Sequence, residues 1–206
     1  MTHASNSTEY ALVCRPGEGG TLRLDYRAFA YAGKFVVGAP GKAVVRTSDG
    51  SPAVRDWAPA ERLPEPAAPE ALDADVAAAV AFSPDRTDPD RCRLRYVTVH
   101  AALRGDGLGP RLIGETVVDL AAAGFDRVAI AVNNPFAYEA CHKRGFAYTG
   151  ERTGIAELEL ERPAAEAADV DPDRYREGLA AFRDTATELS RAEREFVDAR
   201  LRRGPP

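Results

Sequence analysis

The sequence predicts an α/β domain followed by a helical C-terminal appendage, and three stretches of the chain carry this prediction. Strand-like and helix-like patterns alternate over residues 93–146. Apolar and charged residues alternate from Ala156 to Glu161, which is typical of a half-buried strand. An apolar stripe at helical spacing begins at Tyr175. Because 206 residues suffice for one full core plus an appendage, we expect one domain over residues 1–163 and a helical extension over 164–206.

Composition places the chain among ordinary folded proteins, with 45% hydrophobic and 29% charged residues. No apolar run approaches the roughly 20 residues that a membrane-spanning helix needs. Residues 1–9 are polar and lack the apolar centre of a signal peptide. We therefore expect a cytoplasmic protein without a membrane partner. The net charge of −5 argues against a nucleic-acid partner, since general binding to phosphate needs a basic face.

Cysteine and histidine are too sparse for a disulfide framework or a metal site. The chain holds three of each: Cys14, Cys92, Cys141, His3, His100 and His142. The cysteines are scattered and form no Cys-x-x-Cys pair, and three histidines provide few candidate metal ligands. We expect no metal.

The first third of the chain predicts short strands. Thr8 to Cys14 reads as a strand, and residues 15–20 as a turn. Residues 21–34 are ambiguous, because they alternate like a strand at Leu22 and Leu24 and yet include a possible helix start at Asp25. Residues 35–37 and 43–46, separated by a Gly-Ala-Pro-Gly turn, predict a hairpin.

Residues 51–71 interrupt the pattern with prolines at 52, 59, 64, 66 and 69 and predict an extended loop. We favour a flexible insertion, because long proline-rich segments often lack fixed structure. The alternative is a lid over a substrate site, with Trp57 as its anchor. The apolar run Asp75 to Phe82 can be a strand or a helix, and the turn signal Ser83-Pro84-Asp85 favours a strand.

The segment Arg104 to Gly109, reading Arg-Gly-Asp-Gly-Leu-Gly, predicts a phosphate-binding loop. It follows a strand-like run over 93–100 and precedes a helical stripe over 112–123 that ends at Gly124. Its glycines allow consecutive N–H groups to face an anion at the positive end of the helix. Pro110 fits the first helical turn, which has no use for the missing N–H.

The second half of the chain predicts a strand over 127–132, Asn133-Asn134-Pro135, a short helix, and a stop at Gly145-Phe146. Asp171-Pro172 then starts a helix with a stripe of apolar residues, and Ser190 with Glu193 starts a second helix as a capping box. The stripe comprises Tyr175, Leu179, Phe182, Ala186 and Leu189, and the second helix carries Phe196 and Leu201. We expect this pair to pack on the core or across a homodimer, and the alternative is a helix that recruits a partner.

Three blocks match one family in order and spacing: Val97-Thr98-Val99, Arg104 to Gly109, and Asn134-Pro135 through Gly145-Phe146. Over about residues 92–160 the chain resembles the GNAT superfamily of acyl-CoA-dependent N-acetyltransferases. The resemblance implies a mixed, mostly antiparallel central sheet flanked by helices. It also implies transfer of an acetyl group from acetyl-CoA to a primary amine. The acceptor stays open among small amines, amino acids, polyamines, and protein lysines or N-termini.

The resemblance also implies the acetyl-CoA contacts. The backbone at Val97 and Val99 would hold the thioester carbonyl oxygen and pair with the pantetheine arm like an added strand. The pyrophosphate would rest on the amides of Arg104, Gly105, Asp106, Gly107, Leu108 and Gly109, with Asp106 acting only through its backbone. Asn134 would contact CoA or shape the start of its helix.

Catalytic groups are less evident. Where many family members carry a tyrosine proton donor, this chain has Cys141. Tyr138 and His142 lie nearby on the same predicted helix, and we favour Tyr138 or Cys141 as the donor, with solvent as the alternative.

No general base can be named, because Arg93 and Arg95 occupy the outward strand positions, where they could favour an anionic acceptor. The rival reading is a non-catalytic acyl-CoA-binding regulatory module. A nucleotide-binding protein is a weaker one, since the loop lacks the Gly-Lys-Ser/Thr ending of a P-loop.

Overall fold

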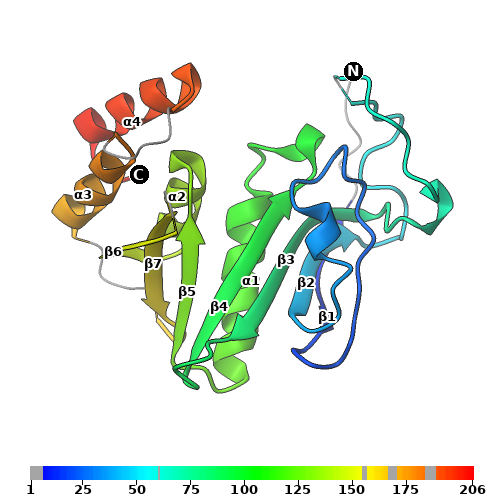
Figure 1. Cartoon of the computed structure of the whole chain (residues 1–206), viewed down its shortest axis with the longest axis horizontal. Helices are drawn as coiled ribbons and strands as arrows, with labels where there is room; N and C mark the ends of the chain where they lie inside the picture. Colours follow the sequence, from blue (N-terminus) through cyan, green and yellow to red (C-terminus); the bar gives the residue numbers. More distant parts are fainter. Residues whose placement is uncertain (1–6, 60, 155–156, 167–170, 184–188) are drawn as a thin grey trace. The chain divides into compact units, whose positions relative to one another are not determined.

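The computed structural model describes residues 7–59, 61–154, 157–166, 171–183 and 189–206. Within these ranges seven strands form one sheet in the order β1-β2-β3-β4-β5-β7-β6 (Figure 1). The strands are β1 Thr8–Cys14, β2 Gly41–Thr47, β3 Val76–Pro84, β4 Arg91–Val99, β5 Arg127–Val132, β6 Ala147–Thr153 and β7 Glu157–Pro163. The α-helices are α1 Leu108–Ala122, α2 Pro135–His142, α3 Pro172–Arg183 and α4 Arg191–Arg203. Short 3₁₀ turns span Ala32–Lys34, Pro69–Ala71 and Ala101–Leu103.

The sheet is mixed and mostly antiparallel, which confirms the expected fold class. Strand β2 runs antiparallel to β1 and β3, and β7 runs antiparallel to β5 and β6. The β4–β5 pair is parallel, and its ladder joins Arg91–Leu94 to Arg127–Ile130. Beyond that ladder β4 continues to Val99. No described helix is both long and apolar enough to cross a membrane.

The chain divides into two compact units. The first unit contains the described residues of 7–83 together with 95–116, and the second contains those of 84–94 and 117–206. Strand β4 and helix α1 contribute residues to both.

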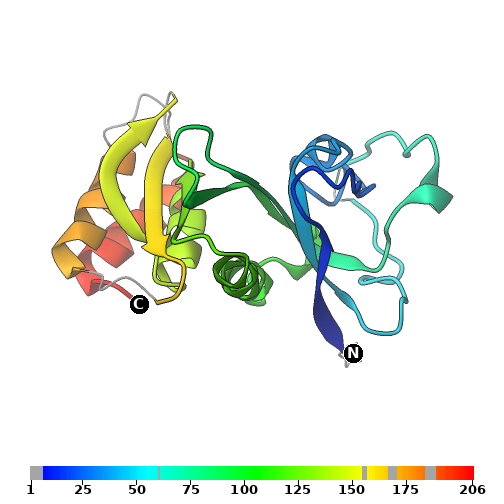
Figure 2. The same ribbon diagram turned by 90° about the horizontal axis from the view of Figure 1, so that it is seen from below.

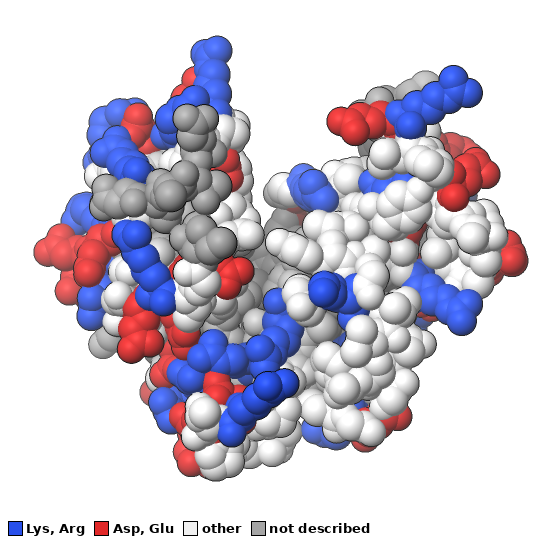
Figure 3. All heavy atoms as spheres, viewed as in Figure 1, with Lys and Arg blue, Asp and Glu red and all other residues white. Residues whose placement is uncertain are grey.

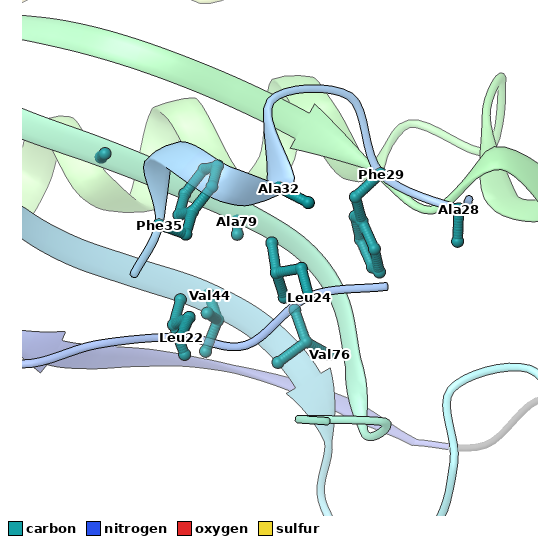
Figure 4. Packing of buried hydrophobic residues seen from close by; sticks show 10 residues of the cluster. Leu22, Leu24, Ala28, Phe29, Ala32, Phe35, Val44, Val76 and Ala79 are labelled. Atoms are coloured by element: carbon teal, nitrogen blue, oxygen red, sulfur yellow. The ribbon is translucent and has the colours of Figure 1, made fainter. Parts of the chain in front are cut away.

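In the first unit, the segment before β2 covers the sheet with side chains rather than with regular structure. Figure 4 shows Leu22, Leu24 and Phe35 beside the strand residues Val44 and Val76, and all five are buried. The ambiguous residues 21–34 form turns and one 3₁₀ turn, so neither the strand nor the α-helix is present there. Hydrophobic burial fixes this irregular segment.

The predicted hairpin over 35–46 is wrong. Strand β2 is present, but it pairs with β1 and β3, and residues 35–37 are not a strand. Lys42 gives the physical reason. Its buried Nζ donates to the carbonyl oxygens of Gly20 (2.6 Å), Val37 (2.7 Å) and Pro40 (3.1 Å), which draws the preceding chain around the ammonium group.

In the second unit, α3 packs beside β6 and α4 beside α3, as Figures 1 and 2 both show. Tyr175, Leu179 and Phe182 are buried, so the predicted stripe is confirmed as far as Phe182. Ala156 and Ala186 lie outside the described residues.

The start of the last helix is also confirmed. The Ser190 side chain and Glu193 cap α4 reciprocally as a capping box. Both helices pack on α2, as expected for a structural pair. Figure 3 shows basic and acidic side chains intermixed over these helices.

Candidate functional site

The glycine loop lies between a 3₁₀ turn and α1. Gly105 and Gly107 have φ angles of 95° and 79°, in the left-handed region that other residues rarely adopt. A Cβ atom at either position would meet nothing within 4 Å. The loop therefore needs glycine for its backbone conformation and not to make room for neighbouring protein atoms.

The N–H groups of the loop glycines face no acceptor within the described residues. The Arg111 N–H donates to the Gly107 carbonyl at 3.1 Å. For the N–H groups of Gly105, Gly107 and Gly109, the described part of the chain supplies no acceptor. Unpaired N–H groups at a helix N-terminus carry partial positive charge and suit an anion. Phosphate binding by this loop stays a prediction.

Arg104 joins the loop to the end of β4. Its Nε donates to the Val99 carbonyl oxygen at 3.4 Å, while the side chain stays exposed. Val97 and Val99 lie beyond the β4–β5 ladder and are half-buried. Asp106 is exposed, which agrees with a role through its backbone alone. The structure therefore brings the predicted carbonyl-binding strand end and the glycine loop together within the first unit.

Thr98 adds an unusual polar group to this strand end. It is 4% exposed, and its hydroxyl has no hydrogen-bond partner among the described residues. A buried unpaired hydroxyl costs free energy, so such groups are rare away from functional sites.

Asn134 belongs to the second unit, where it caps α2. Its Oδ1 accepts a hydrogen bond from the Ala137 N–H at 2.9 Å, and Pro135 follows in the first turn. The predicted role at the helix start is confirmed, because this bond satisfies one of the orphan donors of the first turn. The predicted contact with CoA stays a prediction.

Tyr138 is buried in the second unit, at 1% exposure. Its ring packs 5.5 Å from that of Tyr175 and 5.8 Å from that of Phe182, and its hydroxyl donates to the Tyr175 carbonyl at 3.2 Å. Burial raises the pKa of Tyr138, so the phenol holds its proton firmly.

Cys141 lies one turn later and is equally buried. Burial raises the pKa of its thiol to about 12. Half-buried His142 lies with its ring 4.3 Å from Tyr175, and burial lowers its pKa although Glu139 opposes the shift. The assignment of Tyr138 or Cys141 as proton donor stays a prediction, and the burial of both favours protonation by solvent.

The outward arginines of β4 have internal partners. Arg93 donates to Asp85 and, at 2.9 Å, to Glu159, while Arg91 binds the same two carboxylates. Hydrogen bonds from Thr87 and Arg93 hold the pKa of Asp85 well below its usual range. Arg93 is therefore not a free charge for an anionic acceptor.

Two further positions refine the sequence reading of these strands. Glu159, which the alternating pattern placed outward, is 3% exposed because it pairs with these arginines. Arg95 is exposed, and its Nε donates to the Ser83 hydroxyl at 2.8 Å.

A pocket of about 530 Å³ in the first unit escaped the sequence reasoning. Segments 25–29, 52–57 and 69–74 line it, together with His100. The Trp57 ring lies 4.9 Å from the His100 ring, so the alternative in which Trp57 anchors the proline-rich segment fits this contact. One sequence feature could have indicated this pocket: His100 directly follows the predicted carbonyl-binding strand end.

Comparisons with known proteins identify the family of this chain. A family model described as "Acetyltransferase (GNAT) family" matches residues 43–146, just over half of the 206 residues. A search of the curated proteins finds no match.

The solved structures that this chain matches are distant from it in sequence. An N-acetyltransferase from Staphylococcus aureus Mu50 is 14% identical, with a TM-score of 0.44, over 61% of this chain and 68% of that one. Nourseothricin acetyltransferase is 15% identical, with a TM-score of 0.44, over 76% and 98%. The Thermoplasma acidophilum PaiA N-acetyltransferase, in complex with coenzyme A, is 15% identical, with a TM-score of 0.38, over 45% and 56%.

Proposed function

Because the chain belongs to the GNAT acetyltransferase family, we propose that it transfers an acetyl group from acetyl-CoA to a primary amine. The observation that carries this proposal is the glycine loop, whose N–H groups have no acceptor among the described residues and surround open space at the start of α1. Such a loop supports binding of the CoA pyrophosphate.

Residues of the first unit would hold the co-substrate. The N–H groups of the loop bind the pyrophosphate oxygens, and Arg104 adds positive charge beside them. The main chain of Val97 and Val99 pairs with the pantetheine arm along the end of β4. Apart from the Arg104 charge, these contacts require backbone geometry more than side-chain chemistry.

The chemistry forms a bond from the amine nitrogen to the acetyl carbon and breaks the bond from that carbon to sulfur. The N–H of Val97 or Val99 stabilises the negative charge that grows on the carbonyl oxygen, a contribution on the order of 10²-fold in rate for one such donor. An ammonium acceptor first gives up one proton to water, because only the neutral amine has the lone pair that attacks. After the attack the nitrogen loses a second proton to water, and the departing thiolate gains one from solvent. Tyr138 and Cys141 stay alternatives for this last step.

Calorimetric titration with acetyl-CoA tests the binding step, with ATP and NAD as controls. Saturable binding of acetyl-CoA alone is the expected result. Equal binding of ATP would favour a general nucleotide site instead, and absence of acetyl-CoA binding would overturn the proposal.

A non-catalytic acyl-CoA-binding module is the second candidate. The ion pairs of Arg93 and the burial of Tyr138 and Cys141 favour it, because each removes a side chain from the candidate acid–base groups. Both functions predict acetyl-CoA binding. They differ in turnover, since only an enzyme releases free CoA faster when an amine is added.

A further inference from the structure

We infer that the pocket of the first unit binds the acceptor and selects a cationic amine that carries an uncharged oxygen acceptor next to it, an inference that rests on the proposed acetyl transfer. The chemistry is that of an α-amino carbonyl group without a carboxylate. It occurs in an amino-acid amide and in the N-terminal residue of a peptide.

A hydrogen bond at Nδ1 fixes the tautomer of His100. Its Nδ1 accepts a hydrogen bond from the Ala102 N–H at 3.2 Å, and a main-chain N–H can only donate. The proton of the neutral imidazole must therefore sit on Nε2. Since the described residues supply no partner for Nε2, this N–H is left to donate to a ligand.

The neutral state of His100 follows from its surroundings. The side chain is buried, with Phe29 and Trp57 as edge-on neighbours at 5.2 and 4.9 Å between ring centres. Burial lowers the pKa of His100, Asp25 opposes this shift, and Arg104 adds to it. A ring that stays neutral is a hydrogen-bond donor through Nε2 and a poor base, so it recognises a ligand oxygen.

The charges around the pocket determine which ligand charge it favours. The three lining carboxylates belong to Asp25, Asp56 and Asp73, and the two guanidinium groups to Arg27 and Arg55. Asp25 and Arg27 neutralise each other through hydrogen bonds of 2.8 to 3.1 Å. The remaining wall has one more negative charge than positive, which attracts an ammonium group and disfavours a carboxylate.

The size and position of the pocket suit a small acceptor. Its volume of about 530 Å³ lies within the usual range for small-molecule sites, and Trp57, Val54 and Leu72 supply apolar surface. His100 directly follows Val99, the residue proposed to bind the thioester carbonyl. An amine whose carbonyl oxygen is held by Nε2 is therefore placed near the end of β4, where acetyl transfer would occur.

Trp57 is the only tryptophan of the chain, so its fluorescence reports directly on the pocket. The probes are leucinamide, leucine and isoamylamine, which share one apolar body and differ in the group beside the amine. We expect a saturable change with leucinamide at a Kd at least about tenfold below those of the other two. Equal affinities, or no saturable change with leucinamide, would overturn the inference.

Substitution of His100 tests the hydrogen bond that Nε2 is inferred to donate to the ligand oxygen. Asparagine is a good helix cap, so His100→Asn can keep an acceptor for the Ala102 N–H while removing the nitrogen that reaches the pocket. The leucinamide preference should fall to less than about twofold in this variant and persist in the His142→Asn control. Persistence of the full preference in His100→Asn would contradict the inference.

Two further measurements are needed. One distinguishes a peptide from a small-molecule acceptor, and the other distinguishes failure of this inference from failure of the proposed acetyl transfer. Tighter binding of leucyl-glycyl-glycinamide than of leucinamide would identify a peptide N-terminus, and equal or weaker binding a small molecule. Acetyl-CoA affinity is measured separately by calorimetry. Acetyl-CoA binding without the leucinamide preference would overturn this inference alone, whereas the preference without acetyl-CoA binding would overturn the proposed acetyl transfer.

Discussion

Gly107 is required for its backbone conformation and not for side-chain packing. Its φ angle is left-handed, the space around it is open, and its N–H has no acceptor in the described part of the chain, just before α1. The sequence predicts this loop from local features, the glycine spacing and the helix that follows, and its binding of phosphate stays a prediction. The unpaired N–H groups are what the structure adds to the prediction.

Gly107→Ala should weaken acetyl-CoA binding by at least about tenfold, because the methyl group occupies the space of the pyrophosphate and the left-handed backbone is strained. Gly50→Ala is the matched control, since Gly50 has a φ of 71° and equally open surroundings outside the loop. Both variants should lose about 1–2 kcal/mol of stability from strain. Calorimetry and thermal unfolding make the comparison. Equal acetyl-CoA affinity in the two variants would remove the loop from the site.

Tyr138→Phe separates a structural hydroxyl from a catalytic one. Loss of the hydrogen bond to the Tyr175 carbonyl should cost about 1 kcal/mol of stability, and turnover should stay within about twofold because the hydroxyl is buried. Tyr148→Phe, at another buried tyrosine, is the control. A tenfold loss of turnover in Tyr138→Phe alone, with acetyl-CoA affinity intact, would instead assign Tyr138 as the proton donor.

His100 should protonate below the ordinary histidine pKa of about 6.5, because burial lowers its pKa. The unfolded chain then binds the proton first as the pH falls, so the stability contributed by neutral His100 is present above about pH 6.5 and lost below it. Trp57 fluorescence followed against pH measures the midpoint in the folded protein, with His100→Asn as the control. A His100-dependent midpoint above 6.5 would be incompatible with the neutral tautomer.

At the scale of elements, strong local periodicity predicted most of the fold. The strand over 127–132, the helix after Asn134 and the capping box at Ser190 all lie where the sequence placed them. Strand β6 was missed because Thr149-Gly150-Glu151 breaks the apolar alternation, and pairing with β7 supplies what the local pattern lacks.

The segment before β2 was beyond local reasoning for a different reason. Its conformation depends on contacts distant in sequence, such as the Lys42 ammonium bound to the Gly20 carbonyl. The same holds for the pocket, since His100 and Trp57 are 43 positions apart by their numbers and meet only in the folded chain. Glycine spacing indicates a cofactor loop, whereas an acceptor pocket has no comparable local pattern.

A cluster of ion-paired side chains links helix α4 to α2. Buried Glu139 accepts hydrogen bonds from Arg200 and pairs with Lys143 at 2.8 Å, while the Tyr175 hydroxyl lies 3.5 Å away. Burial acts to raise the pKa of Glu139, but the hydrogen bonds from Arg200 and Lys143 outweigh it and lower the pKa. The stability from this cluster is therefore present above the usual carboxyl range and lost as the pH falls through it.

Arg200→Met should lower the free energy of unfolding by about 1–3 kcal/mol, because Glu139 loses its charged hydrogen-bond donor. Arg202→Met on the same helix is the matched control, since Arg202 is exposed and has no partner among the described residues. Urea unfolding at pH 7 gives the difference. Equal stability of the two variants would show that the cluster does not hold α4.

At the scale of the whole molecule, the chain combines the glycine loop proposed to bind acetyl-CoA with a separate pocket proposed to bind the acceptor. Residues from the segments 25–29, 52–57 and 69–74 line a pocket that also contains His100 and the sole tryptophan of the chain. No described side chain stands out as a general base, so the account relies on positioning and backbone hydrogen bonds. Rate enhancement by positioning alone can be large when two reactants are held together.

Amine-dependent release of free CoA would show whether the chain transfers the acetyl group. The full chain is mixed with acetyl-CoA and leucinamide, free thiol is followed in time, and the acetylated product is identified by mass. The account predicts thiol release that saturates with the amine and forms one acetyl-leucinamide per thiol. Saturable acetyl-CoA binding with no amine-dependent release, across leucinamide and a panel of other primary amines, would contradict it and leave a binding module in place of an enzyme.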